Sequence, residues 1–155
     1  QESYDDVREL LLNFRTRLAE QDFSTSVQTV LQRFESQTQI SARLKTEGDG
    51  ARLSPQQQLQ VIFILQEALS NIRKHAQASE VQITMTNQDD FQLIIEDDGQ
   101  GFDAQTLAQK QSGHVGTHIM QERANNIHAE LTIESKIGRG TQVSLRLPAN
   151  QRVIL

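Results

Sequence analysis

An acidic pair runs directly into a glycine-rich turn at residues 95–102, which read IEDDGQGF. If the preceding segment is a strand, Asp97 lies on the same face as Ile95, because side chains alternate across a strand. A carboxylate on that apolar face must find hydrogen-bond donors or lose its charge. Gly99 and Gly101 allow a sharp turn or the close approach of a planar ligand. Asp97 is therefore a candidate acceptor for the exocyclic amine of a purine, or else a turn residue that caps local amides.

A second group of polar residues lies in QEALSNIRKHA, residues 66–76. At about 100° per residue, one stripe of a helix there would hold Glu67, Asn71, Lys74 and His75. Asn71 is a candidate magnesium ligand, because magnesium keeps several waters and needs few protein oxygens. Lys74 and His75 could face phosphate oxygens, and Glu67 could accept a proton or orient a nucleophile. The alternative is a solvated helix face that carries no chemistry.

Two glycine-containing segments follow. GHVGTHIM, residues 113–120, is a glycine-bracketed turn that leads into a helix. The first amides of a helix and its dipole favour phosphate, although simple helix capping explains this segment equally well. KIGRGTQV, residues 136–143, fits either a ligand contact or a hairpin turn, and for this segment alone we favour the turn.

The elements that must position these residues follow from the apolar pattern. One helix follows Ser24 or Ser26, a second runs from Ser54 to Ala76 with proline in its first turn, and a third follows Gly113. The expected strands lie at residues 40–44, 81–85, 91–95, 131–137 and 143–147. This order predicts an α/β fold, a two-layer sandwich with a helical layer on one face of a mixed sheet.

The first residues have a helical pattern of their own. In YDDVRELLLNFRTRL, residues 4–18, one seam holds Val7, Leu11, Phe14 and Leu18. Two heptads fit the end of a coiled coil or a short helix packed on its own domain.

Length and composition restrict the class of protein. The chain has 155 residues, of which 36% are hydrophobic and 23% charged, enough for one domain with a core. Its longest apolar run, Val61–Leu65, is far shorter than the roughly 18–20 residues that span a bilayer. Cysteine is absent, which excludes disulfides and is compatible with a reducing compartment. A net charge of -5 without a basic stripe argues against nucleic acid as a partner. The start at Gln1 suggests a piece of a longer protein.

Taken in this order, the four segments resemble the ATP-binding domain of sensor histidine kinases. This is a branch of the Bergerat ATPases, which include gyrase B, the Hsp90 chaperones and the MutL repair proteins. QEALSNIRKHA resembles the N box, DDGQGF the first glycine box, GHVGTHIMQERA the second and GRGT the third. The resemblance covers roughly Leu44 to Leu147, and four motifs in order are far more specific than one. The N-x-x-K-H-A and G-H-x-G spellings are most similar to the nitrate and nitrite sensor branch.

The resemblance implies a Bergerat fold with a mostly antiparallel mixed sheet, and ATP and Mg²⁺ as cofactors. Asp97 would accept from the adenine amine, Gly99 and Gly101 would shape the purine pocket, and Asn71 would ligate magnesium. Glu67, the catalytic residue, would assist the attacking histidine. The other ATP-binding residues that the resemblance implies are Lys74, His75, Gly113, His114, Gly116, Thr117 and Thr141.

Two local features accompany these roles. The stretch Asp103 to Ser112 would form a short lid, of a kind that closes in microseconds to milliseconds. The branch usually has leucine at the position of Thr117, so the hydroxyl there either replaces a packing contact or points at phosphate.

The resemblance also implies how the chain is divided and what it works with. Residues 1–22 would be the C-terminal part of a dimerisation and phosphoacceptor helix, 23–150 the catalytic domain and 151–155 a tail. None of the histidines, at positions 75, 114, 118 and 128, has the setting of a phosphoacceptor. The acceptor would lie upstream, in the same protein or its dimer mate, so the chain should bind ATP without phosphorylating itself. A response regulator would be the further partner. The domain would be cytoplasmic, and an inner-membrane-anchored parent protein would be its only link to a membrane.

Two rival functions remain. One is another Bergerat enzyme, which hydrolyses ATP with Glu67 activating water. The other is a non-enzymatic dimerisation module with a vestigial nucleotide site. A P-loop or dinucleotide-binding fold is excluded, because GxxxxGK is absent and DDGQGF places its acids before the glycines.

Overall fold

The computed structural model describes residues 23–48, 50–101 and 115–152. The predicted helix over residues 4–18 and the lid at 103–112 lie outside these ranges. The elements follow one another as α2 (Phe23–Thr38), β1 (Ser41–Glu47), α3 (Pro55–Asn71), the π-helix η1 (Ile72–Ala76), β2 (Glu80–Asn87), β3 (Phe91–Asp97), α5 (Val115–Asn126), β4 (Glu130–Lys136), β5 (Gly140–Leu147) and the 3-10 turn η3 (Ala149–Gln151). The predicted order of helices and strands is confirmed.

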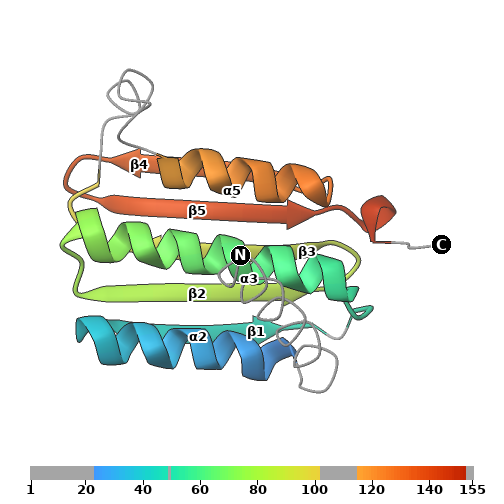
Figure 1. Cartoon of the computed structure of the whole chain (residues 1–155), viewed down its shortest axis with the longest axis horizontal. Coiled ribbons are helices and arrows are strands. Elements are labelled where there is room, and N and C mark those ends of the chain that lie inside the picture. The colour runs from blue at the N-terminus through green and yellow to red at the C-terminus, as the bar shows by residue number, and fades with distance from the viewer. Residues whose placement is uncertain (1–22, 49, 102–114, 153–155) are drawn as a thin grey trace, which may run out of the picture.

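The strands form one five-stranded sheet in the order β1-β2-β3-β5-β4. β1 and β2 are parallel, whereas the β2–β3, β3–β5 and β4–β5 pairs are antiparallel. Figure 1 shows α2, α3 and α5 lying over one face of this sheet. The expected two-layer sandwich on a mixed, mostly antiparallel sheet is therefore confirmed.

The core lies between the sheet and the helices. Every second residue of β3 is buried, and Leu93 at its centre is fully shielded from solvent. Val61, Ile64 and Leu65 of α3 are equally buried, because α3 lies along the middle of the sheet, as Figure 1 shows. Burying such a side chain contributes about 1.5–3 kcal/mol, so α3 and β3 are held firmly in relation to each other.

Helix α3 begins as its sequence predicts. The Ser54 hydroxyl accepts from the Gln57 amide at 3.1 Å, and the Gln57 side-chain oxygen accepts from the Ser54 amide at 3.0 Å. Pro55 occupies the first turn, where a missing amide hydrogen costs nothing. This capping box fixes the register of the helix that carries Glu67 and Asn71.

The other end of that helix differs from the expectation. The apolar pattern predicted one regular helix to Ala76, but after Asn71 the chain widens into η1, which ends at Ala76 and is followed by Gln77 in the left-handed region (φ 52°). A π-turn adds a residue to the turn and re-aims the side chains that follow. Apolar periodicity does not register this change, because η1 is followed at once by a loop.

One predicted strand residue was also assigned wrongly. Ile137 was expected in the fourth strand, but β4 ends at Lys136 and Ile137 is 74% exposed in the turn before β5. The chain reverses there because Gly138 and Gly140 have positive φ angles, 81° and 88°. The prediction that KIGRGTQV forms a hairpin turn is confirmed.

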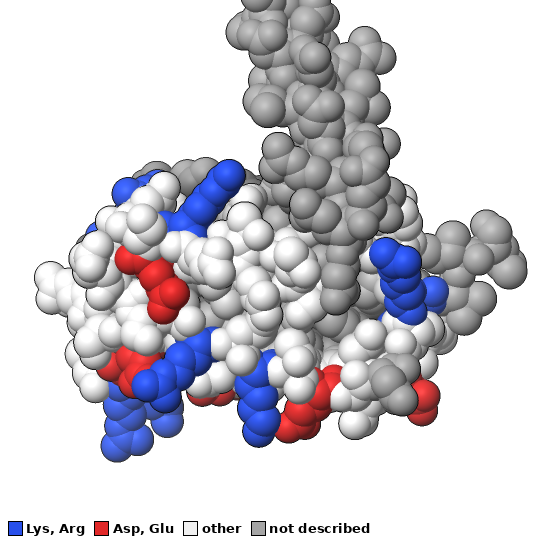
Figure 2. Space-filling model, turned by 90° about the horizontal axis from the view of Figure 1, so that it is seen from below, with Lys and Arg blue, Asp and Glu red and all other residues white. Residues whose placement is uncertain are grey.

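The edge strand β1 is lined with charges. Arg43 pairs with Glu80 at 3.5 Å and Lys45 with Glu47 at 3.1 Å, all largely exposed. Figure 2, which views the molecule from the β1 side, shows basic and acidic side chains close together there rather than gathered by sign. Charged side chains on an edge strand disfavour pairing with another sheet.

Candidate functional site

Asp97 is the last residue of β3 and is only 9% exposed. Its Oδ1 accepts from the Gly99 amide at 2.8 Å, and the backbone of Thr141 on the paired strand also hydrogen-bonds to the carboxylate. Burial raises the pKa of Asp97 above 3.8, the bonds from Gly99 and Thr141 oppose the rise, and the nearby Asp98 charge adds to it. The predicted inward-facing carboxylate is confirmed.

Glycine is required where the β4–β5 turn closes on this acid. A Cβ on Gly140 would overlap the Asp97 carbonyl oxygen, and a Cβ on Gly101 would overlap the Lys136 carbonyl oxygen. Both glycines also have positive φ angles, 88° and 67°. The first glycine box and the GRGT segment, which are distant in sequence, are therefore in direct backbone contact.

Asp98, to which the sequence analysis gave no role, caps the neighbouring loop. Its carboxylate accepts from the Ser79 amide at 2.9 Å, the Ser79 hydroxyl at 2.6 Å and the Glu80 amide at 3.0 Å. These bonds, that of the Ser79 hydroxyl first, lower the pKa of Asp98 below 3.8. The sequence feature that could have revealed this role is the alternation of side chains, which turns Asp98 to the side opposite Asp97. Asp98 serves the local amides before β2, while Asp97 remains at the interior.

The stripe from α3 reaches the same end of the sheet. Glu67 and Asn71 are half-buried and one helical turn apart, and Lys74 and His75 are exposed on η1. The Gln100 carboxamide donates to the His75 carbonyl oxygen, which joins η1 to the glycine loop. Gln100 is a second residue that sequence reasoning missed, and nothing in its local sequence points to His75.

The remaining predicted ATP-binding residues are only partly described. Gly113 and His114 lie outside the described residues, while Gly116 and Thr117 fall in the first turn of α5 without described side-chain surroundings. The contact of Thr117 with phosphate therefore stays a prediction.

Thr141 is half-buried beside Asp97, and its hydroxyl lies 2.8 Å from the Ser135 hydroxyl. The Ser135 hydroxyl also donates to the Gly140 carbonyl at 3.1 Å. This places polar groups of β4 and β5 next to the Asp97 carboxylate, and ligand sites in general have a few such placed polar groups.

The donor set around Asn71 fits magnesium better than a softer metal. Among the described residues, no group of three or more His, Cys, Asp or Glu is placed to hold a metal ion. Asn71 and Glu67 offer oxygen atoms, and magnesium is held by one or two protein oxygens together with substrate phosphates and water. The residues present therefore suit an ion that arrives with a nucleotide.

Comparison with known proteins places this geometry in a family. Residues 56–151 match the family model described as histidine kinase-, DNA gyrase B-, and HSP90-like ATPase. The sensor protein NarQ homolog of Haemophilus influenzae is 31% identical over 94% of this chain and 25% of its own length. The nitrate/nitrite sensor protein NarQ of Escherichia coli is 32% identical over 93% and 25%, and the histidine-protein kinase/phosphatase DegS of Brevibacillus brevis 33% over 94% and 38%. The chain thus spans well under half the length of these relatives.

Solved structures share the fold. The histidine kinase domain of the Erythrobacter litoralis EL346 blue-light activated kinase has a TM-score of 0.69 at 18% identity, over 84% of this chain and 66% of that one. The histidine kinase AdeS of Acinetobacter baumannii has a TM-score of 0.67 at 15% identity, over 96% and 81%. Within the described ranges, no helix is long and apolar enough to cross a bilayer. The fold agrees with these comparisons, and the chain belongs to the histidine kinase-, DNA gyrase B- and HSP90-like ATPase family, as an ATP-binding domain of the sensor histidine kinase type.

Proposed function

We propose that this chain binds ATP with Mg²⁺ and donates the γ-phosphoryl group to a histidine on a dimerisation helix of its parent protein. The observation that carries the proposal is Asp97, a buried carboxylate at a strand end where two segments meet through glycine. An acceptor fixed in an apolar pocket recognises an amino group, because a ligand that lacks the group leaves the carboxylate unpaired. The exocyclic amine of adenine fits this requirement.

The other residues of the site serve the phosphates and the transfer step. Lys74 and His75 are exposed on η1 and would face phosphate oxygens. Asn71 and the phosphates would hold magnesium, which neutralises charge on the transferred group. The attacking imidazole nitrogen bonds to the γ-phosphorus as the bond to the β–γ bridging oxygen breaks, and ADP leaves with that oxygen. Glu67 accepts the proton from the other imidazole nitrogen.

The histidine that accepts the phosphoryl group, and the response regulator that receives it next, would both lie outside the described residues. Proteins similar to this chain are named as sensor proteins and as signal-transduction histidine-protein kinases, which supports an upstream phosphoacceptor helix. In the parent protein the domain would be cytoplasmic, below an inner-membrane-anchored sensor. The phosphorylated histidine would pass its phosphoryl group to a response regulator.

Calorimetric titration with ADP and then a nonhydrolysable ATP analogue, with and without magnesium, tests the proposal. We expect Asp97→Asn to weaken binding by about 1–3 kcal/mol, the cost of mispairing a buried hydrogen-bonding site. Asp89→Asn, an exposed acid in the β2–β3 turn, is the matched control and should bind as the unmodified chain does. Equal affinity of both variants would remove Asp97 from the pocket. Steady phosphate release by the chain alone would instead favour an ATP-hydrolysing Bergerat enzyme.

A further inference from the structure

Gln100, which lies between Gly99 and Gly101, contacts both the β4–β5 turn and the end of η1. Its backbone carbonyl accepts from the Gly138 amide at 2.6 Å, in the turn between β4 and β5. Its side-chain amide donates to the His75 carbonyl, on the last turn of η1. One residue thus ties the β4–β5 turn to the end of the helix that begins at Pro55.

The carbonyl that Gln100 contacts lies at the C-terminal end of η1. A terminal helix carbonyl has no partner within the helix, so the His75 carbonyl needs an external donor. η1 is a π-helix, a rare element that is frequently found at functional sites. The chain leaves it through a left-handed residue, Gln77. The bond from Gln100 therefore fixes the orientation of this last turn.

The same turn presents a group of basic side chains. Arg73, Lys74 and His75 are all exposed there, and none of them forms an ion pair with another residue in the described ranges. Cations on a fixed turn beside a buried acceptor suit a ligand with an amino group at one end and anionic oxygens at the other. The orientation of η1 decides whether these side chains reach the anionic oxygens of the ligand.

We propose that Gln100 is a positioning residue for the phosphate end of the nucleotide. Its carboxamide holds η1 so that Lys74 and His75 face the phosphates, while Asp97 recognises the amino group of the base. The inference rests on the nucleotide-binding function proposed above. Asp98 does not have this role, because its bonds go to Ser79 and Glu80, beyond the end of η1.

The first test compares two variants that each replace glutamine by the isosteric methionine. Gln100→Met removes the donor to His75 and leaves the backbone bond to Gly138 intact. Gln92→Met, near the start of β3 and so at the end of that strand opposite Asp97, is the matched control. We expect Gln100→Met to weaken binding of the ATP analogue about 3- to 10-fold and of adenosine less than about 2-fold, consistent with loss of one hydrogen bond. Equal losses for adenosine and the ATP analogue, or no loss, would overturn the proposal.

A double-mutant cycle asks whether Gln100 acts through the cations. In the Lys74→Met variant, Gln100→Met should weaken binding of the ATP analogue by a smaller factor than it does in the unmodified chain, because the Lys74 charge that Gln100 helps to position is already gone. Fully additive effects would contradict a role through Lys74.

Amide hydrogen exchange separates this inference from the nucleotide proposal, since it needs no ligand. In the free protein, exchange at residues 72–77 should quicken about 3- to 10-fold in Gln100→Met and stay unchanged in Gln92→Met. Unchanged exchange in both would refute the tie to η1, even if nucleotide binds. Faster exchange in a chain whose unmodified form binds neither ADP nor the ATP analogue would refute the nucleotide function and the positioning role, leaving only the structural bond.

Discussion

At the scale of the residue, two adjacent aspartates behave in opposite ways, because Asp97 ends β3 with its side chain buried whereas Asp98, the next residue, is exposed and turns toward Ser79 and Glu80. Burial raises the pKa of Asp97, whereas hydrogen bonds from Ser79 and Glu80 lower the pKa of Asp98. The raised pKa means that ionised Asp97 costs folding free energy, so its contribution to stability falls as the pH rises from 3.8 through its folded pKa. Asp98 contributes stability above 3.8, which is lost as the pH falls through its lowered folded pKa.

The Asp97 shift predicts a pH dependence of binding. The carboxylate accepts from an amine best when ionised, so nucleotide affinity should fall as the pH falls through the raised pKa of Asp97, which lies above 3.8. Protonation of the nucleotide itself also changes its affinity, and the pH profile of Asp97→Asn measures that contribution. The difference between the two pH profiles from calorimetry isolates Asp97. Parallel profiles would show that its ionisation does not serve binding.

At the scale of the element, the β4–β5 hairpin closes the site because its glycines permit a close backbone approach. Gly138 and Gly140 share positive φ angles, but only the second of them faces another strand end. A Cβ at Gly138 would meet nothing within 4 Å, whereas one at Gly140 would overlap the Asp97 carbonyl. The two positions therefore separate backbone strain from steric contact.

This pair gives a matched prediction. Gly138→Ala should cost about 1–2 kcal/mol of unfolding free energy, from the left-handed backbone alone. Gly140→Ala should cost more and should also weaken nucleotide binding, because β5 must move away from Asp97. Denaturant unfolding and calorimetry measure the two effects. Equal losses of stability with equal nucleotide affinities would mean that the hairpin does not shape the pocket.

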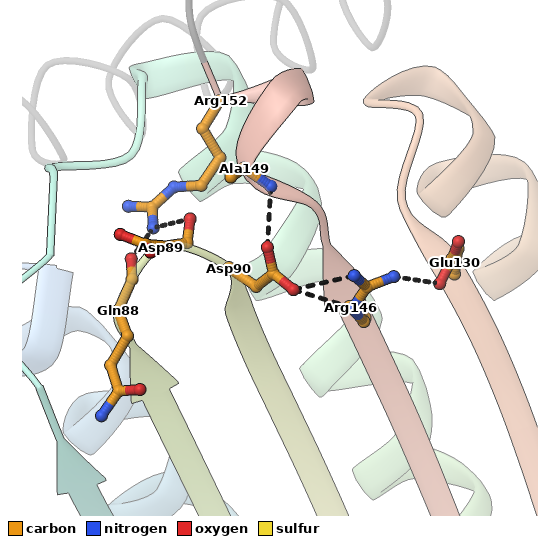
Figure 3. Close-up of polar contacts among 7 residues, drawn as sticks. All are labelled: Gln88, Asp89, Asp90, Glu130, Arg146, Ala149 and Arg152. Carbon is orange, nitrogen blue, oxygen red and sulfur yellow. Dashed lines mark hydrogen bonds and ion pairs between the residues drawn. The ribbon is translucent and has the colours of Figure 1, made fainter.

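At the scale of the whole molecule, a polar network fastens the end of the sheet opposite Asp97. Figure 3 shows Arg152 reaching the backbone carbonyls of the β2–β3 turn, at 2.6 Å for Gln88 and 3.2 Å for Asp89. Its other terminal nitrogen donates to the Ala51 carbonyl. Asp90 accepts from the Ala149 amide at 2.9 Å and pairs with Arg146 at 2.8 Å, while Arg146 also pairs with Glu130. Residues beyond β5 are thus part of the fastening of the sheet.

We expect Arg152→Met to lower the free energy of unfolding by about 1–3 kcal/mol, since three carbonyls in two segments lose a charged donor. Nucleotide affinity should not change, because this network lies at the far end of β3. Arg33→Met on the exposed side of α2 is the control and should leave stability within about 0.5 kcal/mol. A stable Arg152→Met chain with weakened binding would mean that the two ends of the sheet are coupled.

Much of this protein is determined by its sequence, because the responsible interactions are local or periodic. The Ser54 capping box spans three residues, alternation along β3 places Asp97 inward, and glycines mark the β4–β5 turn. The resemblance of the four motifs, in their order, to those of sensor histidine kinases also indicated the family. These features can be predicted without knowledge of any long-range contact.

The tertiary structure alone decided the partners that act across the fold. The Asp98 carboxylate reaches Ser79 from 19 positions away, and Gln100 reaches His75 from 25. Arg152 meets Ala51 across 101 residues, and the π-turn of η1 replaced an expected regular helix. The periodicity of a helix or a strand relates only residues that are close in sequence, so it cannot predict these pairs. They depend on which strand ends and loops the sheet order β1-β2-β3-β5-β4 brings together. The sequence therefore determined which residues could do chemistry, and the packing of the sheet determined which neighbours hold them in place.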